Sequence, residues 1–293
     1  MGREKILKLG AINIVQHPHT EEKQEYIELF EEIAKNPIPT KIRGQYYGLI
    51  DKVEVNRKEG FIFGKFYRYT NINKNSPWLN IKEKSPIVDD DGKAVQQVED
   101  HIKPNLKEIY FYFIIKNHRL VFDSKIISPN SIKEFLRNVI SNTDFKNIKR
   151  ESVNITVEQS AESLDEILNM YFISQIDLII DRPNPDDISP NLETGVKRRL
   201  ENMEADSYQQ VIKSDHSSIK PDKELKDYMG VARSNGSVNV KGKDETGKSI
   251  SESTESHSLE VKTSYNDGEE TYLGAFKSRA FIVVSDIMEK LRN

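Results

Sequence analysis

Residues 108–124 read EIYFYFIIKNHRLVFDS. Two runs rich in aromatic and β-branched residues, Glu108 to Lys116 and Arg119 to Ser124, flank the polar pair Asn117-His118. Such residues favour strands, and a short polar break between two strand-like runs predicts a hairpin. This is the clearest hairpin in the sequence, and the flanking segments are assigned outward from it.

The segment after this hairpin alternates between helix and strand patterns. Ser128 followed by Pro129 is typical of a helix N-terminus. The helix that follows has an apolar stripe made of Ile132, Phe135, Leu136, Val139 and Ile140. Val153 to Val157 and Phe172 to Ile180 are predicted strands, and the capping box Ser163-x-x-Glu166 predicts a short helix between them.

The N-terminal segment predicts a strand, a helix and a second hairpin. Lys8 to Val15 has a strand pattern, and Thr20 is the expected N-cap of a helix with Glu21 and Glu22 in its first turn. The apolar stripe of that helix is Tyr26, Leu29, Phe30 and Ile33. Gln45 to Val55 and Phe61 to Tyr69 are predicted strands joined by a loop ending at Gly60, and 71–101 is predicted to be a long loop.

The C-terminal third is more polar. We expect helices over Leu192 to Met203, Lys223 to Met229 and Tyr272 to Arg292, the last with a stripe of Phe281, Val284, Met288 and Leu291. Weak strands are expected over Ser237 to Lys243 and Ser258 to Ser264. The fold class is therefore α+β, with a mixed or antiparallel sheet, helices on one face and split βαβ-like units. We place an α+β domain at 1–187 and a smaller strand-hairpin and helix region at 188–293.

Composition excludes several classes of protein. The 293 residues include no cysteine, which excludes disulfides, zinc–thiolate sites, iron–sulfur clusters and cysteine nucleophiles. No stretch approaches the ~18 consecutive apolar residues of a membrane-spanning helix, and the first residues are charged rather than signal-like. We expect a soluble cytoplasmic protein without a membrane partner.

A phosphate-loop pattern is formally present. Gly242 to Ser249 fits G-x-x-x-x-G-K-S. A true phosphate loop follows a buried strand and opens a helix, whereas this pattern follows a thin polar strand and precedes a serine-rich stretch. We favour a surface hairpin over nucleotide binding, and we expect no cofactor.

Two acidic clusters could hold a divalent metal ion. Asp89-Asp90-Asp91-Gly92 is favoured as a solvated turn. Asp181, Asp186 and Asp187 come at or after the end of a predicted strand, where a metal-dependent nuclease could place its carboxylates, although capping of the turn is the favoured explanation. No metal site is assigned.

Nucleic acid is the favoured partner class. Residues 103–151 carry a net charge of +5 although the whole chain carries −4. Basic and aromatic residues interleaved on strands can grip phosphates and stack on bases. The candidate binding residues are Lys41, Arg43, Tyr46, Tyr47, Arg57, Lys58, Lys65, Tyr67, Arg68, Lys133, Arg137, Lys197, Arg198 and Arg199.

Several segments resemble known proteins. Ile127-Ser128-Pro129-Asn130 entering a helix, then 153–159 and then 182–187, resemble the uncharacterised bacterial domain-of-unknown-function family 4747, over roughly Lys5 to Ser207. Val240 to Gly247 is similar to a segment of the phage lambda Rex exclusion protein A, a dimeric DNA-binding protein of phage exclusion. Neither resemblance supplies catalytic residues.

These observations lead to one hypothesis with two alternatives. The hypothesis is a non-enzymatic nucleic-acid-binding or sensor component of a bacterial anti-phage defence system, with self-association expected. The alternatives are a metal-dependent nuclease or toxin effector, and a protein-interaction subunit that binds a partner defence protein.

Overall fold

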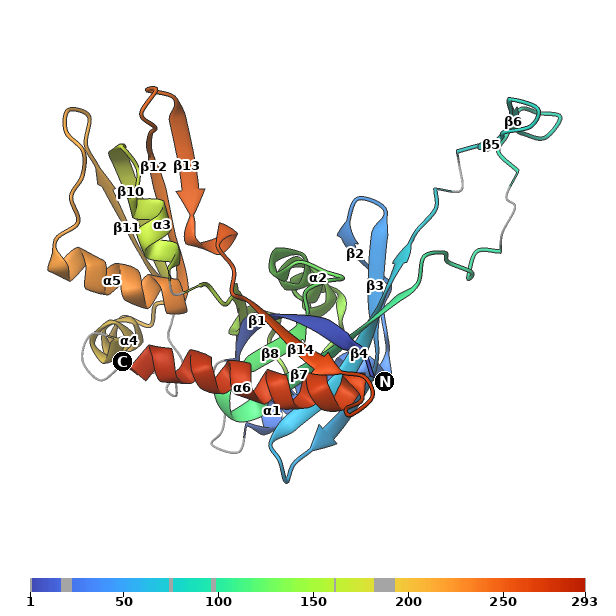
Figure 1. The fold of residues 1–293 in the computed structure, drawn as a ribbon, viewed down its shortest axis with the longest axis horizontal. Coiled ribbons are helices and arrows are strands. Elements are labelled where there is room, and N and C mark those ends of the chain that lie inside the picture. The colour runs from blue at the N-terminus through green and yellow to red at the C-terminus, as the bar shows by residue number, and fades with distance from the viewer. Residues whose placement is uncertain are drawn as a thin grey trace.

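The computed structural model describes residues 2–16, 23–73, 76–95, 99–160, 162–181 and 193–292 (Figure 1). The expected N-cap Thr20, together with Glu21 and Glu22, lies outside these residues. So do Asp186 and Asp187. The α+β class is confirmed by two antiparallel sheets with helices packed on them.

The first sheet contains the hairpin from which the sequence was assigned. Its strand order is β14-β1-β8-β7-β4-β3-β2, and β9 also pairs with β1. Every pairing among its described strands is antiparallel, so the sheet is not mixed. The strands are β1 (Glu4–Gln16), β2 (Thr40–Arg43), β3 (Tyr46–Asn56), β4 (Phe61–Thr70), β7 (Lys107–Ile114), β8 (Arg119–Asp123), β9 (Val153–Val157) and β14 (Glu260–Asn266).

Helices cover both faces of this sheet, so the prediction of helices on one face was wrong. On one face, α1 (Gln24–Lys35) packs Phe30 against Phe111 and Phe113, and α2 (Pro129–Asn142) packs Phe135 against Phe66. On the other face, α6 (Tyr272–Arg292) packs its apolar side on β1, β7 and β8. The physical reason is visible in β8, where all five residues are buried, because a strand with both sides apolar needs cover on both faces.

Two predicted helix starts and one turn can be checked directly. The Ser128 Oγ accepts a hydrogen bond from the Ser131 amide, with Pro129 at the first helical position, as expected. Gly60 has φ 72° in the turn between β3 and β4, a conformation that glycine adopts without strain. The capping box was wrong: α3 (Ser163–Leu168) already includes Ser163, which is fully buried, and Glu162 at the N-cap makes no side-chain cap.

The second sheet is smaller and has the order β11-β10-β12-β13. Its strands are β10 (Phe172–Asp181), β11 (Ser207–Lys213), β12 (Gly236–Lys243) and β13 (Ser249–Ser253). With α3, α4 (Glu193–Asn202) and α5 (Lys223–Ser234) it encloses a separate apolar core that includes Ile176, Leu178 and Val238. The sequence did not predict β11, in which polar Gln209 and Gln210 interrupt the apolar pattern.

The second sheet is an insertion within the first. β9 and β14 both pair with β1, and the chain between them, residues 158–259, leaves and returns at the same place. There the Ser160 amide donates to the His257 carbonyl at 2.9 Å, and the Leu259 amide donates to the Glu158 carbonyl at 2.7 Å. β10 therefore belongs with β11 to β13, whereas β14 and α6 belong with β1. This division differs from the expected boundary at 187/188.

Residues 71–73, 76–95 and 99–106 belong to an extended arm between β4 and β7. The arm projects away from both sheets (Figure 1), and its described outer part contains the short pair β5 (Trp78–Asn80) and β6 (Ser85–Ile87) and a bridged turn at Val88 and Ala94. The described part of the expected long loop is therefore mostly irregular. Short 3₁₀ turns lie elsewhere, at Ile115–Asn117, Arg150–Ser152 and Thr254–Ser256.

A buried ion pair lies where the insertion leaves the first sheet. Arg119 is fully buried, and its Nε lies 2.5 Å from the Oε1 of Glu158, the residue that follows β9. The Arg119 Nη1 also donates to the Asn117 carbonyl at 2.9 Å. Since both charges are removed from water, each depends on the other for compensation.

We predict that Arg119→Met lowers the free energy of unfolding by about 3–5 kcal/mol, because Glu158 then becomes a buried charge without its partner. The double variant Arg119→Met/Glu158→Met should recover most of that loss. Urea denaturation followed by circular dichroism measures both. Equal destabilisation by the single and double variants would contradict this account of the pair.

Candidate nucleic-acid interface

The structure divides the predicted binding residues among several surfaces. The largest set without carboxylate partners lies at one end of the first sheet, where β2 and β4 end and β3 and β7 begin. We call Arg43, Tyr46, Arg68 and Lys107 the strand-end cluster, which adds Lys107 to the predicted residues. Arg43 pairs in register with Tyr46, and Arg68 pairs with Lys107, so these four side chains lie on the same face of the sheet. Lys41 pairs in register with Tyr47, so it lies on the face opposite to Tyr46.

Tyr46 and Arg68 are the centre of the strand-end cluster. The Arg68 guanidinium lies over the Tyr46 ring, with 4.6 Å between its Cζ and the ring centroid, and its Nη1 donates to the Ile126 carbonyl. Tyr46 as a residue nevertheless remains 44% exposed. Within the described ranges, none of the three cations of the cluster forms an ion pair with a carboxylate. The cluster therefore combines positive charge with an accessible aromatic ring.

Lys65 and Tyr67 lie on the opposite face of the sheet and are already engaged. The Lys65 Nζ lies 3.2 Å from Glu108 and 3.8 Å from Asp51, and the Tyr67 hydroxyl donates to Asp51 at 3.1 Å. Hydrogen bonds to Tyr67 and Glu108 raise the pKa of Lys65. Tyr47 shares this face, because side chains alternate along a strand. The aromatic and basic residues predicted to act together are thus divided between two faces.

The remaining predicted residues lie elsewhere. Arg57 and Lys58 are in the turn at the far end of β3, where Arg57 donates to Gln24 at 2.7 Å. Arg198 and Arg199 are exposed on α4, beside the second sheet, and Arg199 lies over the Tyr208 ring. The Lys197 side chain lies outside the described residues. Neither Arg57 and Lys58 nor Arg198 and Arg199 belong to the strand-end cluster.

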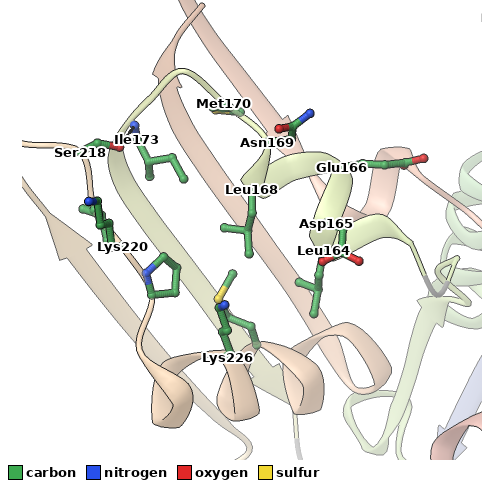
Figure 2. Close-up of a pocket in the computed structure, with 13 residues that line it drawn as sticks. Leu164, Asp165, Glu166, Leu168, Asn169, Met170, Ile173, Ser218, Lys220 and Lys226 are labelled. Atoms are coloured by element: carbon green, nitrogen blue, oxygen red, sulfur yellow. Dashed lines mark hydrogen bonds between the residues drawn. The ribbon is translucent and has the colours of Figure 1, made fainter.

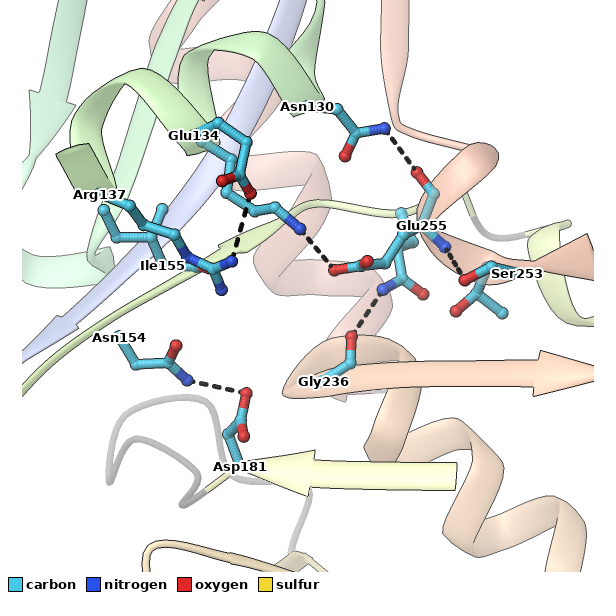
Figure 3. Close-up of polar contacts among 12 residues, drawn as sticks. Asn130, Glu134, Arg137, Asn154, Ile155, Asp181, Gly236, Ser253 and Glu255 are labelled. Carbon is cyan, nitrogen blue, oxygen red and sulfur yellow. Dashed lines mark hydrogen bonds and ion pairs between the residues drawn. The ribbon is translucent and has the colours of Figure 1, made fainter. Parts of the chain in front are cut away.

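Arg137 faces the junction between the two sheets (Figure 3), and Lys133 reaches Glu255 of the insertion. They lie one turn apart on α2, and Lys133 forms an ion pair with Glu255 at 2.9 Å, while Arg137 pairs with Glu134 at 3.3 Å and donates to the Ile155 carbonyl. Both cations therefore already have partners within the protein. Lys133 holds the insertion against α2, whereas Arg137 joins α2 to β9.

Asp181, at the end of β10, belongs to the same junction. Its Oδ2 accepts a hydrogen bond from the Asn154 side chain at 2.8 Å (Figure 3). Burial raises the pKa of Asp181, and nearby Glu255 adds to this, whereas Asn154, Arg137 and Lys133 act in the opposite direction. The net result is a raised pKa. Among the described residues, no group of three or more His, Asp or Glu side chains is placed to hold a metal ion.

The two other patterns noted in the sequence form turns. The phosphate-loop pattern at 242–249 forms the β12–β13 hairpin, in which the Asp244 carboxylate accepts hydrogen bonds from Thr246 and Lys248 and Gly247 has φ 82°. This is the surface hairpin that was favoured. The Asp89 carboxylate likewise accepts from the amides of Asp91 and Lys93.

A pocket that the sequence did not indicate opens beside the second sheet (Figure 2). Its volume is about 850 Å³, and its walls come from α3, the start of β10, residues 218–221 and α5. Leu168, Met170 and Ile173 contribute to an apolar interior. The charged residues Asp165, Glu166, Lys220 and Lys226 also line it. No motif predicts such a pocket, because its walls come from segments far apart in the chain.

Comparison with protein families gives one match. The family model Domain of unknown function (DUF4747) matches residues 5–280. The chain belongs to this family. The match extends through the inserted sheet and into α6, so the family's domain includes both sheets and reaches further than the segment that carried the resemblance in the sequence. No curated protein matches the chain. Among the described residues, no helix combines the length and apolar character needed to cross a membrane.

The raised pKa of Asp181 has a consequence for stability. A carboxyl group with a higher pKa in the folded than in the unfolded state binds more protons when folded, so its contribution to stability decreases as pH rises through this range. Asp181→Asn keeps an acceptor for Asn154 but cannot ionise. We therefore predict that this variant gains stability relative to the parent protein between about pH 4 and pH 7.

Urea denaturation at the two pH values measures this difference. Asp244→Asn serves as a control of opposite sign, because hydrogen bonds from Thr246 and neighbouring amides lower the pKa of Asp244. It should lose stability relative to the parent as pH rises. A pH-independent difference for Asp181→Asn would show that its ionisation is not linked to folding.

Proposed function

We propose that the protein is a non-enzymatic nucleic-acid-binding component of a bacterial anti-phage defence system, and that it binds through the strand-end cluster. The defence setting rests on the similarity of Val240 to Gly247 to the Rex exclusion protein A. The binding activity rests on the geometry at the end of the first sheet. The observation that carries it is the exposed Tyr46 ring held against Arg68 among cations that have no carboxylate partner in the described part of the chain.

Electrostatics favours this surface over the other predicted residues. Lys65, Lys133 and Arg137 are each paired with carboxylates, so a phosphate would have to replace an existing partner. Arg43 and Lys107 are exposed and would only release counterions on binding. Binding at this surface therefore breaks no ion pair among the residues that the structure describes.

The aromatic ring favours single strands. An exposed ring can stack on an unpaired base whatever its identity, and such stacking contributes about 1–3 kcal/mol per base. The Arg68 guanidinium occupies one side of the Tyr46 ring and restricts its motion. A base would use the remaining exposed ring surface while the surrounding cations contact phosphates. We therefore expect single-stranded DNA or RNA to bind more tightly than a duplex.

We predict that Arg43→Glu/Lys107→Glu weakens binding of a fluorescent single-stranded 20-mer by about tenfold or more at low salt, because two phosphate contacts are lost. The slope of log affinity against log salt should fall by roughly 1.4 for a single strand. Tyr46→Ala should reduce affinity with little change in that slope. Fluorescence anisotropy over a salt series measures all three quantities.

The matched control is Lys243→Glu/Lys248→Glu, which reverses two exposed lysines on the β12–β13 hairpin and changes net charge equally. If both double variants bind alike, the strand-end cluster is not the site. The oligonucleotide should also stay intact with added magnesium. Cleavage that Asp181→Ala abolishes would instead favour the nuclease alternative.

A further inference from the structure

The arm exposes apolar side chains that the fold does not use. Leu79 is 66% and Ile81 81% exposed, and none of the three buried apolar clusters includes a residue between 76 and 95. Farther along the arm, Ile102 and Leu106 are also exposed. Exposed apolar residues gathered on one segment are typical of a surface that another protein covers.

The tip of the arm has an ordered shape. Leu79 pairs with Pro86 across the β5–β6 hairpin, and the Asn80 side chain accepts hydrogen bonds from the amides of Lys82 and Glu83. Leu79 and Ile81, two residues apart, project beside a short run of alternating charge, Lys82-Glu83-Lys84. The tip of the arm therefore combines two exposed apolar side chains with three neighbouring charged residues.

The pocket beside the second sheet has complementary features. Its apolar interior can receive aliphatic side chains, and its volume lies within the 300–1,000 Å³ typical of ligand pockets. Figure 2 shows Lys220 on one side of the pocket and Asp165 and Glu166 on the other. Glu166 also pairs with His257, whereas Asp165, Lys220 and Lys226 form no ion pair within the described ranges. Lys82 or Lys84 can thus meet Asp165 while Glu83 meets Lys220 or Lys226.

The arm and the pocket lie at opposite ends of the molecule (Figure 1). We propose that the arm tip of one copy inserts Leu79 and Ile81 into the α3–α5 pocket of a second copy, forming a reciprocal dimer. Reciprocal exchange fills two pockets with two arms and closes the assembly about a two-fold axis. This dimer is independent of the proposed nucleic-acid binding, because the strand-end cluster includes no residue of the tip or the pocket.

The absence of cysteine makes a direct test possible. Ile81→Cys and Asn169→Cys are prepared as separate single variants and mixed, and a short bismaleimide is added. Because each chain then carries one thiol, a covalent product at twice the 33.8 kDa chain mass should form efficiently only in the mixture. Lys58→Cys, on an exposed turn distant from the pocket, replaces Asn169→Cys in the matched control.

Light scattering coupled to size-exclusion chromatography measures the mass of the assembly without cross-linking. The parent should elute at twice the chain mass, and Leu79→Asp/Ile81→Asp should elute at the chain mass. Because both side chains are exposed, this variant should retain the far-UV circular dichroism spectrum of the parent, which separates lost contact from misfolding. Asp90→Ala, an exposed residue of the same arm outside the β5–β6 hairpin, should remain dimeric.

Three results would overturn the proposal. A monomeric parent at 100 μM would exclude the dimer as a stable species. A dimer that survives Leu79→Asp/Ile81→Asp would place the interface elsewhere. Equal cross-linking of Ile81→Cys to Asn169→Cys and to Lys58→Cys would show that the tip is not held at the pocket. None of these measurements contains nucleic acid, so their failure leaves the proposed function standing.

Discussion

The hydrogen bonding of β1 is the constraint on which the rest of the structure depends. This strand pairs with β8 along one edge, while its other edge pairs first with β14 and then with β9. Two strands placed end to end on one edge leave a single point where the chain can depart and return. The second sheet is attached at that point, and the buried pair of Arg119 and Glu158 lies beside it. The position of the pocket, and of the polar junction with α2, follows from this attachment.

The covering of the first sheet by helices on both faces affects which cations remain exposed for binding. Strands covered on both faces can carry a cation inside the fold only if a carboxylate or carbonyl compensates it. Arg119 is compensated by Glu158 and Lys133 by Glu255, and both stay within the protein. At the strand ends, by contrast, Arg43 and Lys107 remain exposed. A count of basic residues along the sequence cannot separate these two groups, whereas their place in the sheet does.

Local patterns were enough to predict most elements of the first sheet. Aromatic alternation predicted β7 and β8, and Ser128 with Pro129 predicted the start of α2, because these signals depend on neighbours in the chain. The local signal at Ser163 was equally good and its helix is present, but the predicted N-cap was wrong because the Ser163 side chain is buried. Pairings between distant segments were beyond such patterns: nothing near Glu260 indicates that it aligns with Gly10. The domain boundary and the pocket depend on those pairings, whereas Tyr46 and Arg68 could be named as candidates because their chemistry is visible residue by residue.

Some apolar and aromatic side chains of this protein are exposed and do not contribute to its buried core. The apolar residues of the two sheets and their helices form three buried clusters. Leu79 and Ile81, in contrast, are exposed on the arm and belong to none of these clusters. Tyr46 is likewise half exposed although nearby Phe66 is buried. Exposed apolar and aromatic side chains contribute little to stability, so replacing them should leave the fold intact. Any loss of association or binding that such replacements cause can then be assigned to the replaced surface. Replacing buried residues of the junction would not allow this, because it would also destabilise the fold.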